Sequence, residues 1–212
     1  MQRLRPILLT AILLWVAAAA QAGVYEDMLN AVNNDDEHAV AELLKRGMDV
    51  NTVGPNGDSV LMVAVRHGKP GMVKTVLDAR PRINARNAYG ETALMLAVFQ
   101  GHTEVVRQLL ARGAEVNHAG WTPLMYAAAR DRVDIARILI SQGALANAQA
   151  ENGTTPLMMA AREGHLKMVL FLLEQGAELN QKTSAGNTAL GMAKGNGRRD
   201  VAEMLTRAGA VE

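Results

Sequence analysis

The sequence predicts an all-α solenoid of about six helix-turn-helix repeats joined by short β-hairpin loops. Three observations support this fold class. Residue types recur about every 33 positions, the second helix of each predicted repeat carries an apolar stripe, and a glycine follows most predicted helix ends. A fixed period of this length is the sequence signature of stacked repeats, which bury their apolar faces against one another.

The period is visible in two columns of polar residues. The first has steps of 33, 30, 33 and 33 residues and consists of Ser59, Thr92, Thr122, Thr155 and Thr188. The second has steps of 33, 33, 30 and 33 residues and consists of Asn51, Asn84, Asn117, Asn147 and Asn180. We expect the hydroxyl residues to cap the first helices, with Pro123 and Pro156 at the first helical position. The repeats are expected at about 24–51, 52–84, 85–117, 118–147, 148–180 and 181–212.

The apolar stripe and the glycines define the second helices. Val105-Val106 with Leu109-Leu110, and Met168-Val169 with Leu172-Leu173, place four apolar side chains on one helical face. The glycines at 47, 113, 143, 176 and 209 follow these helices, where a left-handed cap is easiest for glycine. We therefore expect Leu109 and Leu172 to face the stacked core.

Composition narrows the classes of function. The 212 residues include 22 Lys and Arg, 21 Asp and Glu, and no Cys, with 49% hydrophobic residues. This near-neutral balance argues against a partner recognised through bulk charge, such as nucleic acid or an anionic membrane. The absence of Cys excludes disulfides, thiolate metal sites and a Cys nucleophile.

Residues 1–22 are predicted to be a secretory signal peptide. Arg3 and Arg5 precede an apolar run from Ile7 to Ala20, and Ala20-Gln21-Ala22 fits signal peptidase. The run is shorter than the roughly 20 residues of a membrane-spanning helix, so an uncleaved anchor is the alternative. Cleavage would leave residues 23–212 as one repeat domain that starts at Gly23 and has no stable membrane anchor. Export without disulfides fits a bacterial periplasm best.

Several segments resemble the ankyrin repeat family across about residues 24–212. Thr122-Pro123-Leu124-Met125-Tyr126-Ala127-Ala128 and Thr155-Pro156-Leu157-Met158-Met159-Ala160-Ala161 are similar to its T-P-L-x-x-A motif. Gly101-His102-Thr103-Glu104-Val105-Val106 resembles its second-helix start, and Gly176-Ala177-Glu178-Leu179-Asn180 resembles its exit. The resemblance implies a helical solenoid that binds proteins.

Three departures from the family pattern stand out. The hairpin before repeat four is three residues short, and Arg80-Pro81 stands where the other repeats have a capping glycine, so we expect that connection to deviate locally. Methionine replaces the family's usual motif histidine at Met62, Met95, Met125 and Met158. A Cu(I) site on this column is conceivable, but packed core is favoured because helices in successive layers stand about 8–10 Å apart.

Catalytic patterns are missing, so no catalytic residue, metal site or cofactor is predicted. There is no P-loop, G-x-S-x-G or H-E-x-x-H motif, and no histidine shows metal-ligand spacing. His102 and His165 are expected to serve helix initiation and packing between repeats. The segment from Gly195 to Arg199 could form an anion nest, but a solvated turn is favoured.

The aromatic residues give the candidate site. The resemblance places Tyr89, Phe99, Trp121 and Tyr126 at positions that contact partners in ankyrin proteins, whereas packing of some rings on their neighbours is the alternative. Glu91, Arg130 and Arg162 would complete a polar rim. Trp and Tyr are enriched in binding hot spots.

We therefore expect a monomeric, non-enzymatic interaction protein that acts in the bacterial periplasm through its concave ankyrin surface and binds no nucleic acid. An inhibitor or immunity protein that caps an enzyme or toxin is the first alternative. A periplasmic enzyme or metal-handling protein is the alternative of a different class.

Overall fold

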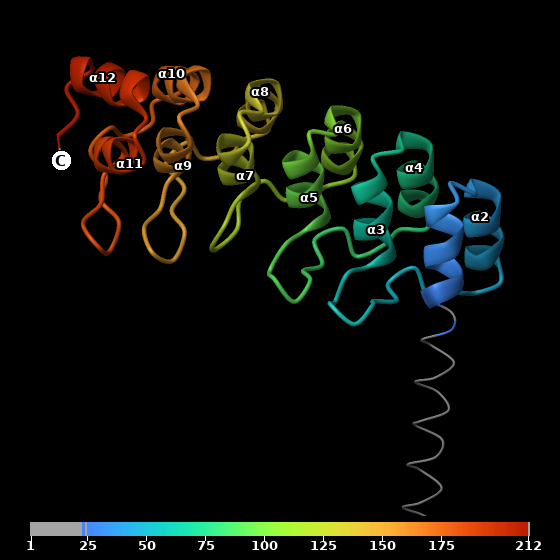
Figure 1. Ribbon diagram of the computed structural model, residues 1–212. Coiled ribbons are helices and arrows are strands. Elements are labelled where there is room, and N and C mark those ends of the chain that lie inside the picture. The colour runs from blue at the N-terminus through green and yellow to red at the C-terminus, as the bar shows by residue number, and fades with distance from the viewer. Residues whose placement is uncertain (1–22, 24, 212) are drawn as a thin grey trace, which may run out of the picture. The chain divides into compact units, whose positions relative to one another are not determined.

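A computed structural model of the chain describes residues 23 and 25–211. The predicted signal peptide lies outside the described residues, so its cleavage stays a prediction. The chain divides into two compact units, one ending at Ala93 and one running from Leu94, and each is described by itself. In the described part of the chain, every predicted repeat holds two helical segments (Figure 1).

The N-terminal unit begins with helical residues 25–33. It continues with α2 (Glu37–Lys45), α3 (Val60–His67) and α4 (Pro70–Asp78), and the second helices α2 and α4 pack against each other. Its core is apolar, with Val40, Met62 and Val76 fully buried.

The C-terminal unit stacks four helix pairs. They are α5 (Ala93–Gln100) with α6 (Thr103–Ala111), α7 (Pro123–Ala129) with α8 (Val133–Ser141), α9 (Pro156–Glu163) with α10 (Leu166–Glu174), and α11 (Ala189–Gly195) with α12 (Arg199–Arg207). The first helices α7, α9 and α11 pack side by side in one layer, and the second helices α6, α8, α10 and α12 form another (Figure 1). Leu109 and Leu172 have no exposed surface, which confirms the predicted register.

The expected cap hydrogen bonds are present at α3, α7, α9 and α11. Ser59, Thr122, Thr155 and Thr188 precede first helices, and each hydroxyl oxygen accepts a hydrogen bond from the backbone N–H three residues later. Pro123 and Pro156 follow their caps at the start of α7 and α9. The methionine column is core, because Met62, Met95, Met125 and Met158 are at most 1% exposed.

Within the C-terminal unit, the asparagine column ties successive repeats together. Asn147 Oδ1 accepts a hydrogen bond from the Glu178 N–H, and its Nδ2 donates to the Gly176 carbonyl at 3.0 Å. Asn117 makes the equivalent pair with Leu145 and Gly143. The periodic asparagines therefore satisfy backbone groups where one second helix ends beside its neighbour.

The loops differ from the expected β-hairpins. Among the described residues, the pairing is limited to one isolated antiparallel bridge, between Val53 and Ser59. The other loops close as turns, for example through the Asn87 N–H to the Glu91 carbonyl and the Ala150 N–H to the Thr154 carbonyl. One bond of this kind closes a loop but does not make a ladder of paired residues.

The connection after α4 deviates locally, as expected. The φ of Arg80 is +55°, which is left-handed as at the glycine positions. The deviation falls on Pro81. In the other repeats the next residue donates a backbone hydrogen bond to the helix end, as the Ala114 N–H does to the Leu109 carbonyl. Proline has no N–H, so this part of the cap is lost.

Candidate functional site: an aromatic patch on the first helices

Three of the predicted rings gather in the C-terminal unit. Phe99 lies in the last turn of α5, Tyr126 lies on α7, and Trp121 precedes the Thr122 cap of α7. The Tyr126 ring centroid is 5.8 Å from that of Trp121 and 6.2 Å from that of Phe99, and both pairs meet edge to face. Such pairs contribute about 0.5–1.5 kcal/mol beyond the area they bury. We call Phe99, Trp121, Tyr126 and Arg130 the aromatic patch.

Arg130 completes the patch from the end of α7. Its guanidinium carbon lies 4.4 Å from the centroid of Phe99, in a cation–π arrangement. The side chain is exposed, while Phe99 and Tyr126 are half-buried and Trp121 is 42% exposed. The patch therefore has rings held by mutual contact and an open outer surface.

Arg162 lies on α9 but is already paired with a neighbour. Its Nε donates to Glu163 Oε1 at 2.9 Å, so its charge is balanced within the same helix end. Its backbone carbonyl accepts a hydrogen bond from Arg198 Nε. Participation of Arg162 in partner binding stays a prediction.

Tyr89 and Glu91 belong to the N-terminal unit and are described there. Tyr89 is 72% exposed at the tip of its loop, and its N–H donates to Asn87 Oδ1. Glu91 is half-buried and accepts a hydrogen bond from Asn87 Nδ2 at 3.0 Å. A role for Tyr89 and Glu91 in partner binding stays a prediction.

A partly buried ion pair in the N-terminal unit joins Asp58 to Arg66. Asp58 is 8% exposed and accepts hydrogen bonds from both terminal nitrogens of Arg66 and from Asn87 Nδ2. Burial alone would raise the pKa of Asp58, but the hydrogen bonds from Arg66 and Asn87 outweigh it and hold that pKa below its ordinary value. The Asp58 carbonyl also accepts a hydrogen bond from the Tyr25 hydroxyl at 3.1 Å. Both carboxylate oxygens of Asp58 accept hydrogen bonds from neighbouring side chains, so this cluster serves structure rather than chemistry.

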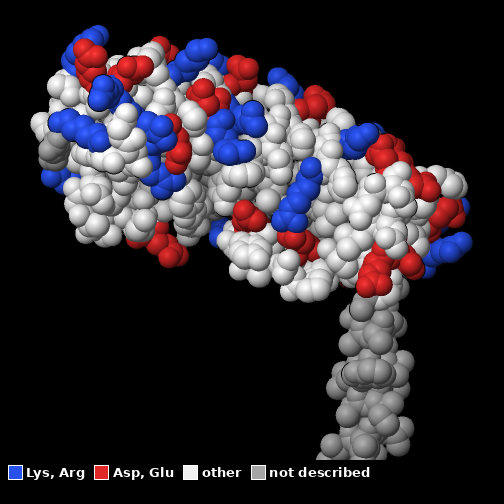
Figure 2. All heavy atoms as spheres, in the orientation of Figure 1, with Lys and Arg blue, Asp and Glu red and all other residues white. Residues whose placement is uncertain are grey.

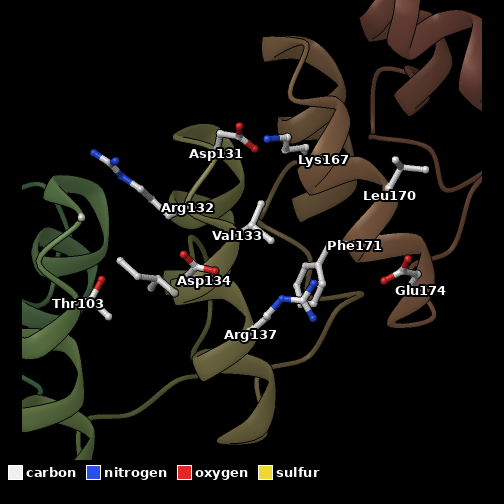
Figure 3. A pocket seen from close by; sticks show the side chains of 12 residues that line it. Thr103, Asp131, Arg132, Val133, Asp134, Arg137, Lys167, Leu170, Phe171 and Glu174 are labelled. Carbon is white, nitrogen blue, oxygen red and sulfur yellow. The ribbon is translucent and has the colours of Figure 1, made fainter.

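A separate cavity of about 620 Å³ opens beside the outer helices α8 and α10 (Figure 3). Arg137 covers Phe171 there, with the guanidinium carbon 4.8 Å from the ring centroid, and Phe171 is only 3% exposed. Three acidic and three basic side chains line it, namely Asp131, Asp134, Glu174, Arg132, Arg137 and Lys167. The lining includes no residue of the aromatic patch, so the two surfaces are distinct.

His165 has structural surroundings. It precedes α10, and its Nε2 lies 3.1 Å from the Ala129 carbonyl at the end of α7, which links two repeats. Among residues 23 and 25–211, no group of three His, Asp or Glu side chains is arranged to hold a metal ion.

None of the described helices has both the length and the apolar character needed to span a bilayer. Figure 2 shows acidic and basic side chains interspersed over the visible face, with no large patch of one sign.

Comparison with known proteins agrees with the geometry. The family model of ankyrin repeats (3 copies) matches residues 28–119, 79–150, 117–183 and 146–211. The glycerophosphocholine phosphodiesterase gde1 of Schizosaccharomyces pombe is 34% identical over 124 residues, covering 57% of this chain and 11% of that protein. The B-cell lymphoma 3 protein homolog of Mus musculus is 36% identical over 118 residues, covering 54% of this chain and 26% of that protein. The chain thus spans only a small part of these relatives, and the match shows a shared repeat region.

A solved structure is similar over much more of its length. It is a chain in the structure of the Bd0816 predatory endopeptidase from Bdellovibrio bacteriovorus in complex with immunity protein Bd3460. The TM-score is 0.76 at 30% identity, and the match covers 85% of this chain and 97% of that chain. Ankyrin repeats are protein–protein interaction modules and are generally non-enzymatic. The matches of the family model together cover residues 28–211, which shows that this chain is a member of the ankyrin repeat family.

Proposed function

We propose that this chain is an exported, non-enzymatic binding protein that recognises a protein partner in the bacterial periplasm through the aromatic patch. The observation that carries the proposal is the arrangement of Phe99, Trp121 and Tyr126. They meet within 5.8–6.2 Å, yet Trp121 remains 42% exposed. Clustered exposed rings on a folded domain usually have a binding role, and Trp and Tyr dominate hot spots because a large ring loses water on binding.

Export is supported by the N-terminal sequence. The basic residues Arg3 and Arg5, the apolar run to Ala20 and the small residues around Gln21 have the order of a signal peptide. The cysteine-free composition is compatible with an oxidising compartment, because packing alone then holds the fold.

The second candidate is an immunity protein that blocks an endopeptidase. The observation that favours it is the likeness to a chain found in an endopeptidase–immunity protein complex, which extends over 97% of that chain. Under this proposal the partner of the aromatic patch is an exported peptidase, and binding closes access to its active site.

Site-specific photo-crosslinking in the source bacterium tests the proposal. The chain is expressed with Trp121→p-benzoylphenylalanine, and illumination should join it to a partner in the periplasmic fraction. The matched control is Leu145→p-benzoylphenylalanine, because Leu145 is 60% exposed in the same unit but outside the patch. Equal crosslinking at both positions, or none at position 121, would refute the patch as the contact surface.

The identity of the crosslinked protein separates the two candidates. A peptidase whose peptide hydrolysis stops when an equimolar amount of this chain is added supports the immunity function. A partner without peptidase activity, or a peptidase that continues to turn over in the complex, would exclude the immunity function. The proposal of a protein-binding function would then remain.

A further inference from the structure

Arg130 carries a positive charge that no acidic side chain among residues 23 and 25–211 balances. Its guanidinium lies over the Phe99 ring, and in the part of the chain that the structure describes it forms no ion pair and no side-chain hydrogen bond. Stacking occupies the face of a guanidinium and leaves the five N–H donors on its edge. The side chain is thus fixed in direction while its donors remain open to solvent.

Trp121 adds a second open donor. Its indole N–H has no acceptor among residues 23 and 25–211, and the side chain is 42% exposed. Indole nitrogen only donates, and so does guanidinium. The open polar atoms of Arg130 and Trp121 are therefore donors set beside aromatic carbon, an arrangement that suits an oxygen acceptor with an apolar neighbour.

Repeat two offers a contrast, although Arg66 lies seven residues after its cap and inside its helix, whereas Arg130 lies eight residues after its cap and is the C-cap of α7. In repeat two, Arg66 near the end of α3 is neutralised by Asp58, which directly precedes the Ser59 cap. In repeat four the residue that directly precedes the cap is Trp121. An aromatic side chain thus stands where repeat two has the acid.

Within residues 25–211, no neighbouring acidic side chain takes the place of such an acid beside Arg130. Glu163, at the end of the adjacent first helix α9, is bonded to Arg162. Asp131 follows Arg130 directly but forms no ion pair with it within the described residues. The missing carboxylate can therefore come from a partner, and opposite charges across an interface favour both encounter and specificity.

We propose that the aromatic patch binds a surface loop of a partner protein in which an Asp or Glu side chain stands beside an apolar side chain. The carboxylate accepts hydrogen bonds from the edge of Arg130, and the apolar group covers the rings of Trp121 and Tyr126. This inference rests on the proposed function and specifies its partner. An internal carboxylate is favoured over a chain terminus because the patch is open, whereas termini are captured in backbone nests.

Selection from a phage library of random linear segments tests the inference. Each segment is fused at its C-terminus to the coat protein, so it has no free terminal carboxylate, and the immobilised target is the processed chain from Gly23. Segments that bind wild type but not Trp121→Ala should be enriched in Asp or Glu adjacent to aliphatic or aromatic residues. A selected segment is then synthesised in an acidic form and with its acid changed to the amide.

Titration of both peptides against variants completes the test. Arg130→Gln should lower the affinity for the acidic peptide by about tenfold or more, because a hydrogen bond to a charged group is lost. The affinity for the amide peptide should stay nearly unchanged. The matched control is Arg137→Gln, which removes the same charge from above the buried ring of Phe171, outside the patch. It should change neither affinity.

The outcomes separate this inference from the proposed function. The inference alone would be overturned if the Trp121-dependent segments show no enrichment in acidic residues. It would also be overturned if selection on Arg130→Gln yields the same enrichment in acidic residues. If no segment depends on Trp121, both the inference and the aromatic patch as a recognition surface fail.

Discussion

Asp58 and Arg66 form a two-point ion pair within the N-terminal unit, with nitrogen–oxygen distances of 2.5 and 3.2 Å. The pKa of Asp58 is lowered because the hydrogen bonds from Arg66 and Asn87 outweigh the opposing effect of burial. A carboxyl whose folded pKa is depressed stabilises the fold fully above its unfolded pKa, about 3.9 for aspartate. That contribution is lost as the pH falls below this value through the folded pKa.

Asp58→Asn should therefore lower the free energy of unfolding by about 1–3 kcal/mol at neutral pH, because Arg66 and Asn87 lose a charged acceptor. The difference from wild type should shrink as the pH falls below about 4, where the wild-type carboxyl begins to take up a proton. Urea denaturation at a series of pH values measures both. A difference that stays constant down to the acid end would contradict the role of the charge.

Truncation of the stacked core should be costly. Leu109 and Leu172 are fully buried in α6 and α10, so Leu→Ala at either should cost about 2–5 kcal/mol of stability. Leu145→Ala, at an exposed loop position, is the control and should stay within about 0.5 kcal/mol of wild type. Similar denaturation midpoints for all three variants would show that the helical register is wrong.

Arg80→Gly should leave stability unchanged or raise it slightly. The φ of +55° at Arg80 costs about 1–2 kcal/mol for a residue with a side chain, and glycine removes that strain while adding freedom to the unfolded chain. Thermal unfolding of the variant measures the balance. A clear loss of stability would mean that position 80 does not hold a left-handed conformation in solution.

Export should yield a shortened chain. We expect the mature protein to begin at Gly23 and to appear in the soluble periplasmic fraction. Intact-mass spectrometry of the fractionated protein measures this directly. Retention of residues 1–22 in a membrane pellet would instead support the uncleaved anchor.

Much of the fold follows from the sequence because its signals are local. The hydroxyl caps such as Thr122, the helix-start Pro123 and the stripe that holds Leu109 depend on residues within a few positions of one another. Because these signals recur with a fixed period, the repeats they define stack on one another. The resemblance to ankyrin repeats singled out Phe99, Trp121 and Tyr126, and the structure brings these three rings together.

The contacts between repeats could not be predicted in the same way. Arg130 over Phe99 joins residues 31 positions apart, and Asn87 with Asp58 joins residues 29 positions apart. Their geometry depends on rotamers chosen in the packed structure. Sequence alone also could not show that Arg162 is paired with Glu163 while Arg130 is left open.

The most direct test of the central claim compares Trp121→Ala with Phe171→Ala. Trp121 is exposed in the aromatic patch and Phe171 is buried beneath Arg137, so the two truncations separate binding from folding. Phe171→Ala should cost about 3–5 kcal/mol and lower the melting temperature. The decisive quantity is the affinity of folded Trp121→Ala for the crosslinked partner, measured by calorimetric titration beside its melting temperature. The account predicts near-normal melting and a loss of roughly thirtyfold or more in affinity. A Trp121→Ala variant that unfolds readily, yet binds as tightly as wild type per folded molecule, would contradict it.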